Sequence, residues 1–140
     1  MIREITNLHF QQVTSVAISP DENTLLTMSR DNTLKLIDSR MFLPTMTLSA
    51  QGFRVPTNWS KSCFSSDGNY ICAGSSDGSV YIWKNGTLVS TLSKHRFVTC
   101  FYILLILDSS AVVGVAWSPT GGSALYSVSD KEKSLIQWGE

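Results

Sequence analysis

One pattern of apolar and polar positions occurs three times along the chain. Each copy has a short alternating run, a turn rich in Ser, Asn or Gly, a second run, an Asp turn and a third run. Alternation with a period of two is typical of strands with one buried face. The copies lie at 13–38, 60–84 and 112–139, and eleven residues separate the first turn from the Asp in each: Pro20 to Asp31, Ser66 to Asp77 and Pro119 to Asp130.

The second copy also predicts a fourth strand. Asn85 and Gly86 separate two apolar runs, and this dipeptide favours a tight hairpin because both of its positions adopt positive φ. We therefore expect an all-β fold of about three four-stranded antiparallel blades at 13–48, 58–93 and 112–140, after a segment at 1–12 that forms the last strand of a preceding blade. Such blades stack radially, commonly about four to eight to a ring. Three of them would form an open arc.

Residues 97–108 do not fit the repeat. The run FVTCFYILLIL at 97–107 has eleven residues, whereas a membrane-spanning helix needs about 18 or more. The block lies in a connection between blades, where loops are normally polar. We interpret it as an apolar insertion, either a retained intron or gene-model error, or a genuine extra strand at an open blade edge.

Composition and charge argue against several classes of function. Eleven Lys and Arg balance eleven Asp and Glu, unlike the basic surface that nucleic acids require. Three cysteines without a CxxC pair favour neither a disulfide framework nor a zinc site, and the first twelve residues lack a signal peptide's apolar core, so we expect a cytoplasmic protein. The sequence has no GxSxG, P-loop or GxGxxG motif, and we expect no enzyme activity, cofactor, metal or small-molecule substrate.

The run SSDGSVYIW at 75–83 resembles the WD40 repeat family. In that family a Ser or Thr, the turn Asp, the Trp and a His near the start of the blade share a buried hydrogen-bond network. The resemblance implies that this network contains Ser75, Asp77, Trp83, Asp130 and Trp138. Three features depart from the family pattern: Ile37 replaces the Trp of the first blade, Lys84 and Gly139 replace the Asp that follows the Trp, and no Gly-His dipeptide occurs. His95 is the expected stand-in for the family's His.

Within this family the chain is similar to the C-terminal propeller of the autophagy-related protein 16 group. The matching phrases are REI at 3–5, SRD at 29–31, the linker SAQGF at 49–53 with Trp59, and VAWSP at 115–119. The resemblance implies part of a seven-bladed ring, and a protein-interaction scaffold that helps direct the machinery lipidating a ubiquitin-like autophagy protein. Its implied partners are the conjugation complex and adaptors or receptors, with peripheral recruitment to autophagic or endolysosomal membranes.

Four residues are candidates for partner binding. Gln12 stands where animal relatives carry a Lys implicated in membrane-directed conjugation. Phe53, Arg54 and Trp59 lie in the linker, and aromatic residues and Arg are enriched at interface hot spots; the alternative is that they cover a blade edge. For the whole chain the alternatives are a truncated or erroneous isoform without independent function, a WD40 adaptor outside autophagy, and a fragment of a propeller enzyme.

Overall fold

The computed structural model describes residues 2–93, 110–118, 124–130 and 134–138. Eleven strands and no helix occur within these residues. The strands are β1 (Val13–Ile18), β2 (Thr24–Ser29), β3 (Leu34–Asp38), β4 (Leu43–Leu48), β5 (Ser62–Phe64), β6 (Tyr70–Gly74), β7 (Ser79–Lys84), β8 (Thr87–Ser93), β9 (Val112–Trp117), β10 (Leu125–Ser129) and β11 (Leu135–Trp138). The predicted all-β class is confirmed.

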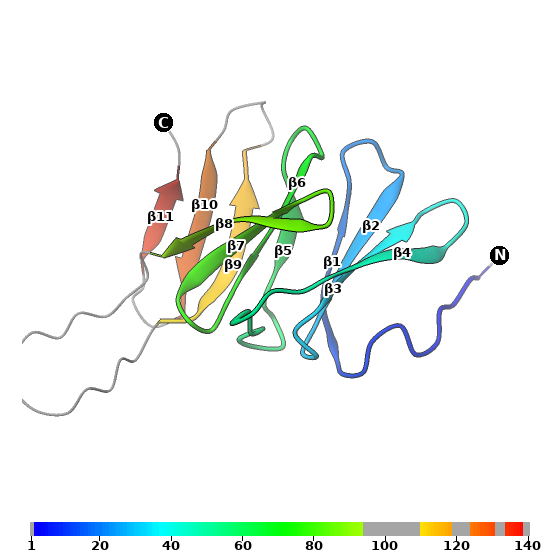
Figure 1. Cartoon of the computed structure of the whole chain (residues 1–140), viewed down its shortest axis with the longest axis horizontal. Helices are drawn as coiled ribbons and strands as arrows, with labels where there is room; N and C mark the ends of the chain where they lie inside the picture. The colour runs from blue at the N-terminus through cyan, green and yellow to red at the C-terminus, as the bar shows by residue number, and fades with distance from the viewer. Residues whose placement is uncertain (1, 94–109, 119–123, 131–133, 139–140) are drawn as a thin grey trace, which may run out of the picture.

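The strands form three antiparallel sheets that follow one another along the chain (Figure 1). The first sheet has the order β1-β2-β3-β4 and the second β5-β6-β7-β8, as the repeat predicts. Within the described residues the third sheet has three strands, in the order β11-β10-β9.

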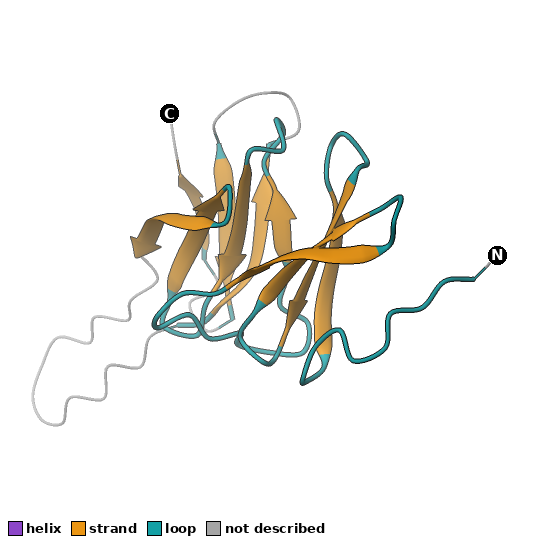
Figure 2. Cartoon of the chain, turned by 45° about the vertical axis from the view of Figure 1, so that its right-hand side comes forward, coloured by secondary structure: helices purple, strands orange, loops and turns teal. Residues whose placement is uncertain are grey.

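The first strands of the sheets, β1, β5 and β9, lie side by side. The amide of Lys61 donates to the carbonyl of Val113 at 3.1 Å, and the amide of Ser62 donates to Ser15 Oγ at 3.2 Å. The sheets fan out from this shared inner edge, and β4 and β8 are the outermost strands of the first two sheets (Figure 2). This is the predicted arc of blades.

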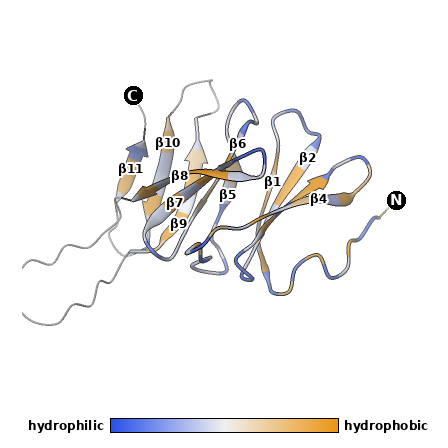
Figure 3. Ribbon diagram, in the orientation of Figure 1, coloured by the Kyte–Doolittle hydropathy of each residue, from blue (hydrophilic) through white to orange (hydrophobic). Residues whose placement is uncertain are grey.

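Two apolar clusters fill the space between the sheets, and Figure 3 shows that apolar residues concentrate on the strands. Alternate residues of β6 and β7 point to opposite sides, which explains why the second sheet contributes to both clusters. The first cluster contains Leu26, Met28, Leu34, Leu48, Phe53, Val55, Ile71, Ala73, Tyr81 and Trp83; the second contains Cys72, Val80, Ile82, Val112, Val115 and Leu125. By contrast, Val16 and Ile18 on β1 are 67% and 61% exposed, because no described element covers the outer side of the first sheet.

The turns follow the predicted chemistry. Asn85 and Gly86 have φ angles of 48° and 85°, so both central positions of the β7–β8 hairpin are left-handed. The residue after the turn Asp is also left-handed in the first two sheets, with φ of 64° at Asn32 and 79° at Gly78. These residue types tolerate positive φ best and thereby fix the strand register.

Residues 2–12 form no strand, contrary to the prediction for 1–12. A strand needs a ladder of backbone hydrogen bonds with a neighbour. Here the segment is held mainly by side chains: Arg3 Nη1 donates to the carbonyl of Arg40 at 2.7 Å, and His9 contacts the β2–β3 turn. The predicted insertion at 97–108 and His95 lie outside the described residues. None of the described residues belongs to a helix that could cross a bilayer.

Candidate interaction face and its hydrogen-bond networks

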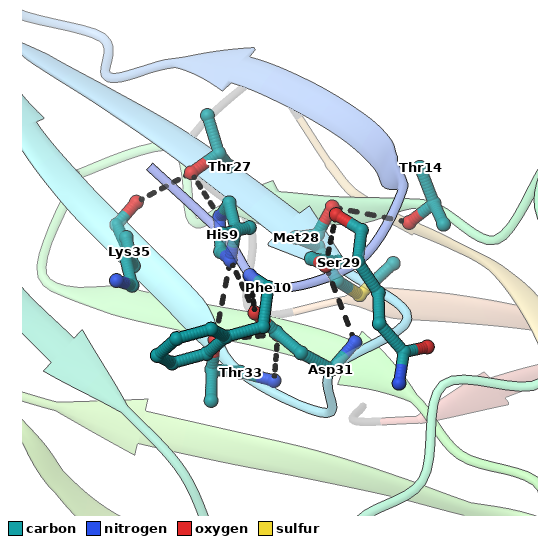
Figure 4. A network of polar contacts seen from close by, with 10 residues as sticks. His9, Phe10, Thr14, Thr27, Met28, Ser29, Asp31, Thr33 and Lys35 are labelled. Atoms are coloured by element: carbon teal, nitrogen blue, oxygen red, sulfur yellow. Dashed lines mark hydrogen bonds and ion pairs between the residues drawn. The ribbon is translucent and has the colours of Figure 1, made fainter. Parts of the chain in front are cut away.

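A buried hydrogen-bond network at the start of the first sheet centres on His9 (Figure 4). His9 Nδ1 lies 3.0 Å from Asp31 Oδ2, and Nε2 lies 2.9 Å from Thr27 Oγ1. An ionised carboxylate can only accept, so Nδ1 donates to Asp31. The Thr27 hydroxyl in turn donates to the carbonyl of Lys35 at 3.4 Å. The side chains of His9 and Asp31 are 1% and 6% exposed. This network fixes the N-terminal segment onto β2 and its following turn.

The Asp31 carboxylate has further donors. The amide of Phe10 lies 3.0 Å from Oδ2, while the amide and hydroxyl of Thr33 lie 3.0 Å and 2.7 Å from Oδ1. Burial by itself would raise the pKa of Asp31, but the hydrogen bonds from Thr33, Phe10 and His9 outweigh it and hold the pKa below its usual 3.8. Asp31 is therefore a buried carboxylate that joins the N-terminal segment to the β2–β3 turn.

The second sheet replaces the histidine by an aromatic cluster. Asp77 accepts from the amide of Ser79 and from the Tyr81 hydroxyl, both at 2.9 Å. Burial and the bond to Asp77 raise the pKa of Tyr81 to about 12, so the hydroxyl stays a donor. The Phe53 ring packs edge-on against Tyr81 and Trp83, with a centroid distance of 5.3 Å to each ring.

The network predicted for Ser75, Asp77 and Trp83 is not formed in this sheet. Ser75 Oγ instead accepts from the amide of Arg54 at 3.1 Å, and the buried Nε1 of Trp83 has no hydrogen-bond partner. On β6, Ile71 is the cross-strand partner of Trp83. Ala73 lies two residues further along this strand and has no hydroxyl that could accept from the indole. In the third sheet Ser127 fills the corresponding place, and Trp138 Nε1 donates to its Oγ at 2.8 Å.

In the structure, Asp130 does not occupy the turn position that was predicted for it. Its amide donates to the carbonyl of Ala111 at 3.2 Å, as the amides of Arg30 and Ser76 donate to Gln12 and Arg54 at 2.9 Å. Asp130 thus corresponds to Arg30 and Ser76, one residue before Asp31 and Asp77. The cause is an extra residue in the preceding turn: Ser118 N bonds the carbonyl of Ala124, six positions on, whereas Ser19 N bonds that of Thr24, five positions on.

The same backbone bonds place Gln12, Arg54 and Ala111 at equivalent positions ahead of β1, β5 and β9. The starts of these inner strands lie along one edge of the arc, at the bottom of Figure 1. Gln12 and Arg54 are exposed, and Trp59 and Phe10 in the same connections are 72% and 96% exposed. We call Phe10, Gln12, Arg54 and Trp59 the loop face. Phe53 does not belong to it, because its side chain is 0% exposed and packs in the first apolar cluster, so the exposure that its predicted partner binding requires is absent.

A sequence comparison agrees with this geometry. The profile described as "WD domain, G-beta repeat" matches residues 3–38 and 46–84, more than half of the chain. The chain belongs to the WD40 repeat family. The first matched range includes His9, Thr27 and Asp31, the residues of the network in the first sheet.

Individual proteins with similar sequences make the family assignment more specific. The chain is 38% identical to protein tipD of Dictyostelium discoideum over 96% of its length, and 44% identical to autophagy-related protein 16 of Arabidopsis thaliana over 81%. It is 38% identical to protein Atg16l2 of Homo sapiens over 91%. The chain spans only about one fifth of these relatives, covering 20%, 20% and 19% of their lengths.

Sequence reasoning missed three residues of the WD40 networks: His9, Thr27 and Ser127. Because Ile37 replaces the Trp of the first repeat, the network was predicted for the other two repeats only. The first repeat does contain the residue types of this network: a Thr lies four residues before Asp31, and His9 lies 22 residues before it. The three sheets thus contain different subsets of the family's network residues, and in the second sheet Trp83 Nε1 has no partner.

Ala73→Ser is expected to raise the free energy of unfolding by about 1 kcal/mol, the net value of one buried hydrogen bond. The new hydroxyl would give Trp83 Nε1 the partner that Ser127 gives Trp138 at 2.8 Å. Urea unfolding followed by tryptophan fluorescence measures the gain. In a Trp83→Phe background the same substitution should bring no gain, since the indole donor is gone. An equal gain there would contradict the explanation.

Proposed function

We propose that this chain is a non-catalytic protein-binding segment of an autophagy-related protein 16-like protein. The similarity to autophagy-related protein 16 of Arabidopsis thaliana and to protein Atg16l2 of Homo sapiens, over 81% and 91% of the chain, carries the proposal. In the proposed role the segment recruits adaptors or receptors and so helps direct the machinery that lipidates a ubiquitin-like autophagy protein. It would act from the cytoplasm, peripherally at autophagic or endolysosomal membranes.

The loop face supports a binding role. It contains two exposed aromatic residues, Phe10 and Trp59, and the exposed Arg54. Its backbone is anchored, because the amide of Arg54 donates to the buried Ser75 Oγ at 3.1 Å. Aromatic and Arg side chains held by a rigid scaffold lose little conformational entropy on binding, which is why they are frequent hot spots.

Two acidic side chains in turns have structural roles. A hydrogen bond from the Ser19 hydroxyl, assisted by Asn23, lowers the pKa of Asp21 to about 2. Ser65 and Asn69 do the same for Asp67. Carboxylates with such a low pKa cap the turns that contain them, and they are poor general acids or bases near neutral pH. Asp21 and Asp67 are therefore turn-capping residues.

Proximity labelling in cells tests the proposal. The chain is fused to a labelling enzyme and compared with its Arg54→Ala, Trp59→Ala double variant. We expect labelling of autophagy adaptors or conjugation components by the wild type, and a loss of about tenfold or more in the variant, as for two hot-spot residues. Far-UV circular dichroism should show both chains equally folded, because both side chains are exposed.

The matched control is Val89→Ala, Thr91→Ala on β8, two exposed residues at the outer edge of the second sheet. We expect this control to label like the wild type. If the control loses the autophagy partners and the loop-face variant keeps them, the binding surface is wrong. If the wild type labels no autophagy component, the autophagy role is wrong.

A further inference from the structure

Two thiols face each other inside the second sheet. Cys63 on β5 is the direct cross-strand partner of Cys72 on β6, and their Sγ atoms lie 3.2 Å apart. Both are free cysteines. They pack with the second apolar cluster, between the second and third sheets. The third cysteine of the sequence, Cys100, lies outside the described residues.

Packing alone does not require thiols at these positions. The corresponding cross-strand pairs are Ala17 with Leu26 in the first sheet and Ala116 with Tyr126 in the third. At this pair the repeat therefore needs a small residue opposite a larger one. In the first and third sheets an alanine takes the place of Cys63. The reactive pair is a special feature of the second sheet.

The two thiols are not equivalent. Cys63 is half-buried, whereas the Cys72 side chain is fully buried. The hydrogen bond with Cys72 lowers the pKa of Cys63, while burial raises the pKa of Cys72. The thiolate is the reactive form of cysteine, so Cys63 is the thiol that meets an oxidant first and Cys72 is the one that resolves.

We propose that Cys63 and Cys72 form a reversible cross-strand disulfide, with a low-molecular-weight disulfide such as glutathione disulfide as the oxidant. Directly opposed residues of antiparallel strands have Cα atoms about 4.5–5.5 Å apart, within the range of about 4.4–6.8 Å that a disulfide spans. Closing the bond therefore requires side-chain rotation and little movement of the backbone.

The exchange proceeds in two balanced steps. The Cys63 thiolate attacks one sulfur of glutathione disulfide, so a mixed disulfide forms and one glutathione thiolate leaves. Cys72 loses its proton and attacks the Cys63 sulfur, which releases the second glutathione. The two cysteines are oxidised, the glutathione disulfide is reduced, and the two protons of the original thiols end on the two glutathione molecules.

The test is an oxidation series on the 140-residue chain in buffers of graded glutathione and glutathione disulfide. Free thiols are trapped by alkylation and the bonds are identified by intact mass and peptide mapping. We expect a loss of about 2 Da, joint protection of Cys63 and Cys72 from alkylation, and full reversal by dithiothreitol. The same series in urea provides the unfolded reference. Loop closure favours Cys63–Cys72 there too, because these residues are only nine positions apart, so the expected difference is that the native chain forms the bond at a less oxidising glutathione ratio.

Single variants separate the roles of the two thiols. Cys72→Ser should accumulate a glutathione adduct at Cys63, because the mixed disulfide cannot be resolved. Cys63→Ala, which copies Ala17 and Ala116, should leave Cys72 unmodified in the folded chain. The proposal is overturned if the native chain needs a glutathione ratio as oxidising as the urea reference to form the Cys63–Cys72 bond, if Cys100 is the dominant partner, or if no Cys63–Cys72 bond forms.

Discussion

Phe53→Ala is expected to lower the free energy of unfolding by about 3–5 kcal/mol, the usual cost of emptying a buried aromatic site. The Phe53 side chain is 0% exposed, and its ring centroid lies 5.3 Å from those of Tyr81 and Trp83. It enters the first cluster from the connection between β4 and β5, so truncation also releases that loop. Domains are commonly stable by only about 5–15 kcal/mol, so a large share of the stability is lost. Urea unfolding measures the change.

Two control substitutions distinguish lost packing from general disturbance of the loop. Phe53→Leu keeps most of the apolar volume and should cost about 1 kcal/mol. Trp59→Ala alters a 72% exposed residue of the same connection and should change the free energy of unfolding by less than about 0.5 kcal/mol. If Trp59→Ala cost as much as Phe53→Ala, the special role of the buried ring would be refuted.

Phe53 also shows where sequence reasoning reaches its limit. The strands are predictable because a period of two and turn residues such as Asn85 and Gly86 report directly on local backbone geometry. A residue in a connection has no such period, and its burial depends on which sheet the loop crosses. The exposed Trp59 and the buried Phe53 lie only six positions apart, and nothing in their local sequence separates them.

Asp130 illustrates a second limit. The equal spacing of eleven residues in the three repeats suggested a common register. The spacing between two motifs does not reveal which turn contains an extra residue. The extra residue in the turn before Ala124 places Asp130 one position before the site that Asp31 and Asp77 occupy in the other sheets. His9 was missed for a related reason: its partners lie 18 and 22 residues away, and only the fold brings them together.

Asp31→Ala is expected to lower the free energy of unfolding by about 3 kcal/mol, because it leaves several buried donors without an acceptor. The carboxylate accepts from His9 Nδ1 at 3.0 Å, from the Phe10 amide at 3.0 Å and from the Thr33 hydroxyl at 2.7 Å. Its loss should also detach residues 2–12 from the first sheet. Hydrogen exchange at the amides of Phe10 and Thr33 should rise together with the loss of stability measured in urea.

The pH dependence and a matched control make this prediction specific. The folded pKa of Asp31 lies below the 3.8 typical of an unfolded chain, so its contribution is complete above about pH 4 and is lost as the pH falls through the folded value. The stability gap between the wild type and Asp31→Ala should therefore narrow from about pH 7 to about pH 3. Asp130→Ala should cost little at either pH, because Asp130 bonds Ala111 through its backbone amide and its side chain is exposed. An equal, pH-dependent loss in Asp130→Ala would mean that Asp130 does fill the turn position of the third sheet.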